Sequence, residues 1–253
     1  MYPILFKIGP ITIYTYGVMV ALGIFFGSLI LMKLAEKEGI PSKDIADTAF
    51  WTVIAGIIGA RVFFFLYNPQ YLDPWYRLFF FWEGGLVWYG GVIFGALTAV
   101  YFIKKRKIPF WKFADIVAIP LSVGLGFGRI GCTMAGCCYG KECDAPFAII
   151  FHDPHSAAPL GIPLYPTQPI SSAANFLIAG ILYLLYRRKK ATGEIFGFYL
   201  IFYGIFRFLI EFWRATPKEI LGMMSNNQVI SIIMVATGLV IVYYRRKVAG
   251  GVK

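Results

Sequence analysis

The chain has 253 residues, of which 58% are hydrophobic and 18% aromatic, and it carries a formal net charge of +11. A soluble domain has about 25% charged residues, so the 15% found here leaves too little polar surface for a soluble fold. We therefore predict an integral membrane protein, with residues 1–253 as a single membrane domain. The basic residues lie in short runs between apolar segments, which disfavours nucleic-acid binding.

Seven apolar runs are candidate membrane spans, because a spanning helix needs about 20 residues. They cover residues 10–32, 48–66, 86–103, 113–131, 170–186, 195–213 and 228–244. The pattern predicts an all-α protein with seven transmembrane helices. The first run is of spanning length and lacks a clear small-residue cleavage site before Lys33, so we interpret it as a retained helix.

The basic residues between the runs predict the orientation. Sixteen of the 24 Lys and Arg residues lie in the connections 33–47, 104–112 and 187–194 and in the tail from Arg245, whereas five lie on the opposite side. Cytoplasmic loops are enriched in Lys and Arg. The N-terminus is therefore predicted to lie outside and the C-terminus in the cytoplasm.

Two segments on the predicted external side are longer than connectors require. Residues 67–85 mix aromatic and turn residues, as an interfacial segment would. Residues 132–169 contain all four cysteines, both histidines and six of the 14 prolines. We interpret this second segment as a small extracytoplasmic cap.

Charged residues inside the predicted spans call for an explanation, because a charge at the bilayer centre costs about 2.5–3.5 kcal/mol. They are Arg61, Asp115, Arg129, Arg207 and Glu211. Arg207 and Glu211 are four residues apart and could neutralise each other, and Arg61 could extend to the interface. Arg129 has no partner within a helical turn, and an unpaired guanidinium suits a phosphate, which it binds through two parallel hydrogen bonds.

Glycines surround Arg129 at positions 124, 126, 128 and 131. They allow either close helix packing or the approach of a lipid head group. Three of them form a G-x-G-x-x-G string, but no strand precedes it, so we exclude a dinucleotide site.

Cys132, Cys137, Cys138 and Cys143 form a C-x4-C-C-x4-C pattern. A structural zinc site more often has paired C-x2-C spacings, and an external location permits a disulfide. A local disulfide (Cys132 with Cys143 first), inert packing, a reactive thiol and a metal site all remain open.

The motifs together resemble those of the prolipoprotein diacylglyceryl transferase family of bacterial inner membranes. The matching pieces are IGP at 8–10, TYGVM at 15–19, GARVFFFLYN at 59–68, WEGGLVWYGG at 82–91, GFGRIG at 126–131, YPTQ at 165–168, YGIFRFLIEFWR at 203–214 and NQVISI from Asn227. Their order and spacing extend over nearly the full length.

The resemblance implies a seven-helix enzyme with its N-terminus outside and its active site toward the outer leaflet. Such an enzyme transfers the diacylglyceryl group of phosphatidylglycerol to the lipobox cysteine of a prolipoprotein signal peptide and releases glycerol phosphate. It implies no cofactor and no metal. The implied catalytic residues are Arg129, Arg207, Tyr203, Glu211 and Tyr16, and those implied to bind the lipid are Arg129, Arg207, Gly128 and Gly131.

This chain departs from well-studied members of the family at three positions. Tyr89 replaces a histidine proposed as the general base, Cys132 replaces an asparagine and Cys137 replaces a glutamate. An ordinary tyrosine has a pKa of about 10 and is a poor base at neutral pH. We therefore hypothesise that the base is dispensable, because the acceptor thiol is itself nucleophilic. A paralogous lipid-group transferase and a polytopic anion transporter are the alternative functions.

Overall fold

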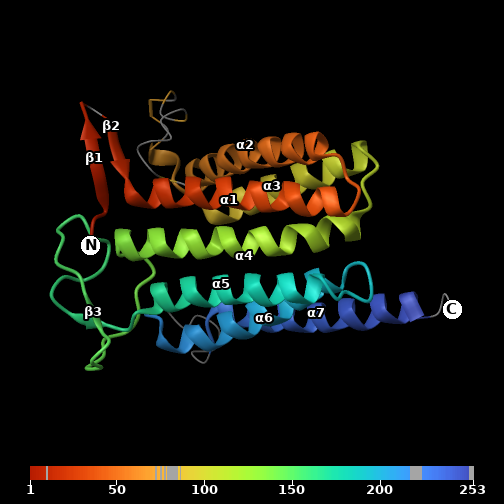
Figure 1. Cartoon of the computed structure of the whole chain (residues 1–253). Helices are drawn as coiled ribbons and strands as arrows, with labels where there is room; N and C mark the ends of the chain where they lie inside the picture. Colours follow the sequence, from red (N-terminus) through yellow and green to blue (C-terminus); the bar gives the residue numbers. More distant parts are fainter. Residues whose placement is uncertain are drawn as a thin grey trace. The chain divides into compact units, whose positions relative to one another are not determined.

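The computed structural model describes residues 1–9, 11–71, 73–74, 76, 78, 85, 87–216 and 224–250. Within them, seven α-helices follow one another along the chain (Figure 1). The helices are α1 (Thr15–Lys37), α2 (Ser42–Tyr67), α3 (Trp88–Lys105), α4 (Phe110–Ala135), α5 (Thr167–Tyr186), α6 (Glu194–Ile210) and α7 (Asn226–Gly250). Each overlaps one predicted span, so the helical class is confirmed.

Six of these helices are long and apolar enough to cross a membrane, which agrees with an integral membrane protein. Among the helices of the described residues, α3 does not meet that criterion. It has 18 residues and ends in Lys104 and Lys105, which shorten its apolar stretch.

The first helix begins later than expected. Residues 10–14 were predicted to be helical, but β1 (Ile4–Ile8) pairs with β2 (Ile11–Tyr14) in an antiparallel hairpin, and α1 starts at Thr15. An apolar run has the same hydropathy in a strand as in a helix, and the pairing with β1 decides between them.

The chain divides into two compact units. One combines residues 1–31 with residues 114–253, and the other is Met32–Phe113. In the first unit, the beginning of α1 and helices α4 to α7 run alongside one another (Figure 1). Glycines allow close helix contacts there: a Cβ added at Gly238 of α7 would lie 2.7 Å from the carbonyl oxygen of Gly197 in α6.

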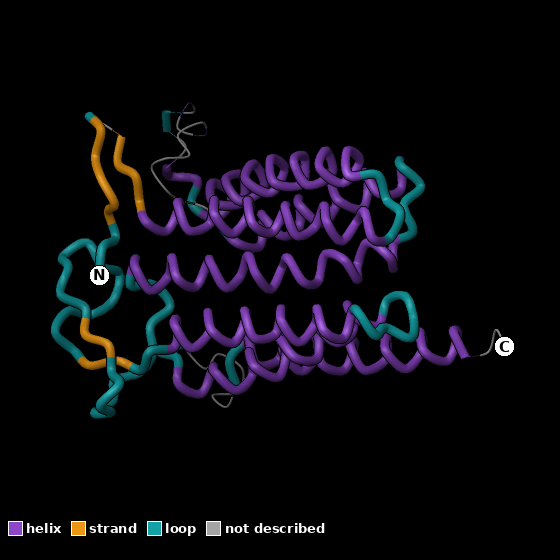
Figure 2. Tube along the Cα trace, in the orientation of Figure 1, coloured by secondary structure: helices purple, strands orange, loops and turns teal. Residues whose placement is uncertain are grey.

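The segment between α4 and α5 has a small core of its own. Strand β3 (Ile149–Ile150) pairs with β4 (Pro163–Leu164), as Figure 2 shows in orange. Phe151, Ala158 and Leu164 are buried together, with Tyr139 and Ile162 packed against them. This core folds most of the predicted cap, residues 132–169, into an ordered structure at one end of the unit.

In the second unit, α2 and α3 pack through glycines: a Cβ added at Gly90 would lie 2.2 Å from the carbonyl oxygen of Gly59. Arg61 of α2 is only 3% exposed. Its guanidinium donates hydrogen bonds to the carbonyl oxygens of Leu78 (3.3 Å) and Gly85 (3.2 Å). These bonds give Arg61 a structural role. Of the predicted interfacial segment 67–85, residues 72, 75, 77 and 79–84 lie outside the described residues.

Candidate active site

The residues singled out for function lie at one end of the first unit. Tyr16 lies in the first turn of α1, Arg129 lies near the end of α4, and Tyr203 and Arg207 lie in the second half of α6. Glu211 opens the single turn that follows α6, a 3-10 helix (Glu211–Trp213). Electrostatic interactions connect Arg129 with Tyr203 and Tyr16, and connect Arg207 with Arg129. The five residues of the implied catalytic set are therefore neighbours.

Glu211 organises the side of this cluster formed by α6 and α7. Its side chain is 2% exposed, and its Oε2 lies 3.1 Å from Nη1 of Arg207 and 3.8 Å from Nε of Arg214. Its Oε1 accepts hydrogen bonds from Oγ of Ser225 (3.0 Å) and Nδ2 of Asn227 (2.8 Å). The ion pair of Arg207 with Glu211, expected from their spacing, is thus formed. Four groups converge on one buried carboxylate.

The positive charge of the cluster exceeds what Glu211 can balance. Among the described residues, Arg207 interacts electrostatically with two further guanidinium groups, those of Arg129 and Arg214, and with one carboxylate, that of Glu211. Within the described part of the chain, Nε of Arg214 is buried and has no hydrogen-bond partner. Arg214 also lines a small pocket with Lys141 and Glu211. The arrangement favours binding of an anion with several acceptor oxygens.

The two glycines implied in lipid binding have different surroundings. A Cβ added at Gly131 would lie 3.1 Å from Cδ2 of Tyr16 and 3.2 Å from Cβ of Met19, so Gly131 lets α1 pack closely against α4. A Cβ added at Gly128 would have no neighbour within 4 Å. Space beside the helix is therefore found at Gly128, one residue before Arg129.

The tyrosines also differ in their surroundings. The Tyr203 ring stacks on the Tyr199 ring, with centroids 5.7 Å apart, and this contact holds it near Arg129. Tyr16 is 41% exposed, although its ring covers Gly131. Tyr89 is exposed at the start of α3, in the unit of residues 32–113, and its part in the reaction stays a prediction.

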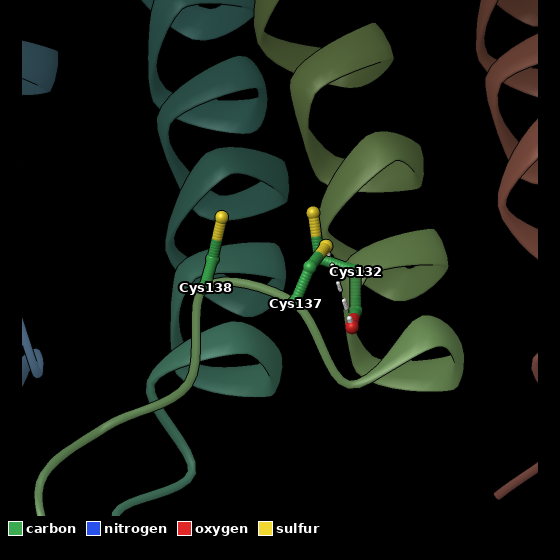
Figure 3. A group of neighbouring side chains, drawn as sticks. All are labelled: Cys132, Cys137 and Cys138. Carbon is green, nitrogen blue, oxygen red and sulfur yellow. Dashed lines mark hydrogen bonds between the residues drawn. The ribbon is translucent and has the colours of Figure 1, made fainter. Parts of the chain in front are cut away.

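All four cysteines are free, so the disulfide considered for Cys132 and Cys143 is not formed. The sulfurs of Cys132, Cys137 and Cys138 lie within 4.8 Å of one another (Figure 3). Hydrogen bonds from the Cys132 and Cys137 thiols, with the positive charges of Arg214 and Arg129, hold the pKa of Cys138 well below its usual range. The Cys138 thiol therefore lies within electrostatic range of Arg214 and Arg129.

Asp115, the other charged residue in a predicted span, has a structural role at the opposite end of α6. Its carboxylate accepts hydrogen bonds from the backbone N–H groups of Gly193 (2.7 Å), Ile195 (3.0 Å) and Phe196 (3.1 Å). These N–H groups lie at the start of α6, where the backbone N–H groups have no hydrogen-bond acceptors within the helix. Asp115 therefore caps α6 from a neighbouring helix.

Sequence reasoning missed several members of the cluster. Arg214 is one of the five basic residues on the predicted external side, and its spacing of three from Glu211 indicates a contact on one helical face. Ser225 and Asn227, which bind Glu211, follow it by 14 and 16 residues in the sequence, and no local spacing reveals such a contact.

Comparison with known proteins gives matches over nearly the whole chain. A family model described as "Prolipoprotein diacylglyceryl transferase" matches residues 3–244. Among curated relatives, a phosphatidylglycerol–prolipoprotein diacylglyceryl transferase of Clostridium tetani is 35% identical over 94% of this chain and 96% of its own length. Proteins of the same name are 37% identical in Clostridium perfringens (94% and 93% covered) and 35% identical in Geobacter sulfurreducens (97% and 96% covered).

Proposed function

Because the chain belongs to the prolipoprotein diacylglyceryl transferase family, we propose that it carries out the first step of bacterial lipoprotein maturation. Its substrates are phosphatidylglycerol and a prolipoprotein signal peptide with a lipobox cysteine. The diacylglyceryl group passes to the cysteine thiol, and glycerol phosphate is released. The chain is therefore a membrane-bound transferase.

The reaction is a displacement at the glycerol carbon that carries the phosphate ester. The sulfur of the lipobox cysteine, after losing its proton, donates an electron pair to this carbon and forms a C–S bond. The C–O bond to the phosphate breaks, and its electron pair leaves with the phosphate oxygen. Negative charge therefore grows on the departing phosphate, where a prearranged cation lowers the barrier most.

The excess of guanidinium groups over carboxylates is the observation that carries this proposal. Arg129, Arg207 and Arg214 with Glu211 give the cluster a net charge of +2. A phosphodiester brings one negative charge, and glycerol phosphate leaves with up to two. We assign the phosphate to Arg129, which has open space beside Gly128, and we assign to Arg207 the stabilisation of the leaving group.

The tyrosines and Glu211 complete the site in this proposal. Tyr16 and Tyr203, both near Arg129, offer hydroxyl donors to the lipid head group. The ion pair with Glu211 holds the guanidinium of Arg207 in a fixed orientation. No strong base is needed, because a thiol is partly ionised at neutral pH and is intrinsically nucleophilic.

We also propose seven membrane spans, with the N-terminus outside and the active site toward the outer leaflet of the inner membrane. In the first unit, the β1–β2 hairpin and the segment between α4 and α5 lie at the end opposite to the end of α7 (Figure 1). In the same unit, the basic connection between α5 and α6 lies at the end where α7 finishes (Figure 1), in agreement with the enrichment of basic loops on the cytoplasmic side. α3 serves as the seventh span in this topology.

The test uses the purified chain with vesicles that contain phosphatidylglycerol and with a synthetic lipobox peptide. We expect release of glycerol phosphate and a mass increase of one diacylglyceryl group on the peptide cysteine. A peptide with serine in place of this cysteine is the matched control and should remain unmodified. Absence of both products, where a relative is active under the same conditions, would contradict the proposal.

A further inference from the structure

Three thiols meet where α4 ends, and the transfer reaction does not use them. Cys132 lies in the last turn of α4 and is buried, and Cys137 and Cys138 follow directly after the helix. Their sulfurs lie within 4.8 Å of one another, and Figure 3 shows all three side chains pointing in the same direction. Three sulfurs this close have the arrangement of ligands around a shared atom.

The backbone around the thiols is shaped for this arrangement. Gly136 (φ 74°) and Cys138 (φ 60°) both adopt the left-handed conformation, which turns the chain back over the helix end. A Cβ added at Gly136 would lie 1.9 Å from Oγ of Ser156, so glycine is required there.

Two buried side chains at the start of α5 then fix the turn. Thr167 donates a hydrogen bond to the carbonyl oxygen of Cys138 (3.2 Å), and Gln168 donates one to that of Cys137 (3.1 Å). The thiols are held in place before any ligand arrives, which lowers the entropic cost of binding.

The spacing of the sulfurs suits a metal ion. A metal–sulfur bond is about 2.3 Å long, so three sulfurs around one ion lie about 4 Å apart. The sulfur atoms lie at most 4.8 Å apart, and small rotations of the cysteine side chains would bring them to this spacing. Metal binding releases the thiol protons, because the thiolate is the form that binds the metal.

We propose that Cys132, Cys137 and Cys138 bind one Cu(I) ion as three thiolates. Soft sulfur ligands suit Cu(I), zinc and iron–sulfur clusters. Structural zinc sites almost always have four ligands, and no fourth His, Cys, Asp or Glu joins the group among the residues that the structure describes. Three thiolates and one Cu(I) carry a charge of −2, and the positive charges of Arg129 and Arg214 lie nearby.

The experiment titrates the full-length protein, reduced and then freed of reductant in detergent, with Cu(I) against a coloured Cu(I) chelator. We expect one Cu(I) per chain, and an affinity at least tenfold lower after Cys132→Ser, Cys137→Ser or Cys138→Ser. Cys143→Ser is the matched control, because Cys143 is outside the group, and its affinity should equal that of the parent.

X-ray absorption of the copper-loaded parent protein is a second readout that needs no variant. It should give three sulfur neighbours at about 2.3 Å. Failure to compete with the chelator, an unchanged affinity in the three serine variants, or a nitrogen or oxygen shell would each overturn the proposal. A tighter complex with Zn(II) than with Cu(I) would overturn the choice of metal.

Discussion

Removal of the Glu211 side chain is the perturbation whose cost the structure defines best. Glu211→Ala takes away the acceptor of two hydrogen bonds, from Ser225 and Asn227, and the carboxylate that pairs with Arg207 and Arg214. The side chains of Arg207 and Arg214 are just 13% and 11% exposed, so water cannot replace the carboxylate in stabilising their charges. Loss of one partner of a buried ion pair costs about 3–5 kcal/mol.

The melting temperature of the purified protein in detergent measures this cost. For a chain of this size, about 1 kcal/mol shifts the melting temperature by about 2–4 °C, so we expect a decrease of about 6–20 °C. Glu194→Ala is a matched control: Glu194 is equally buried and pairs with Arg246 (2.8 Å), but it lies at the other end of α6, about 25 Å away. Glu194→Ala should also lower the melting temperature yet keep transfer activity. A melting temperature of Glu211→Ala within 2 °C of the parent would refute the reasoning.

Three further substitutions test other parts of the account. Tyr89→Phe should retain transfer activity, because we assign no essential proton transfer to this hydroxyl; complete loss of product would show that the assignment is wrong. Asp115→Ala leaves three backbone N–H groups at the start of α6 without acceptors, which costs about 1–3 kcal/mol for each group. The amides of Gly193, Ile195 and Phe196 should then exchange hydrogen much faster. Unchanged protection of these amides would argue against the cap. Gly131→Leu should lower the melting temperature, because the new side chain would collide with α1, whereas Gly128→Ala should leave it unchanged. Equal melting temperatures in the two variants would contradict the conclusion that α1 packs against Gly131 and that there is space beside Gly128.

The helices could be predicted from the sequence because an apolar run of spanning length is a local property. The same reasoning placed the first helix too early, since the pairing of β1 with β2 decides where α1 begins. The role of Arg61 was also beyond local reasoning: its carbonyl partners, Leu78 and Gly85, lie 17 and 24 residues further along the chain.

The candidate site was predictable only in part for the same reason. The spacing of Arg207 and Glu211 within one helix predicted their ion pair, which the structure confirms. By contrast, the C-x4-C-C spacing left the state of the cysteines open, because it does not reveal the left-handed turn that brings Cys137 and Cys138 back toward Cys132.

The rate of glycerol phosphate release by Arg129→Lys tests the central claim, that a guanidinium at this position stabilises the departing phosphate. Lysine keeps the positive charge but loses the two parallel hydrogen bonds, and loss of such a donor typically lowers the rate by about 10²–10³-fold. We expect a decrease of this size per folded protein, with Arg246→Ala, which breaks the ion pair at the other end of α6, close to the parent rate. A rate for Arg129→Lys within threefold of the parent would contradict the account.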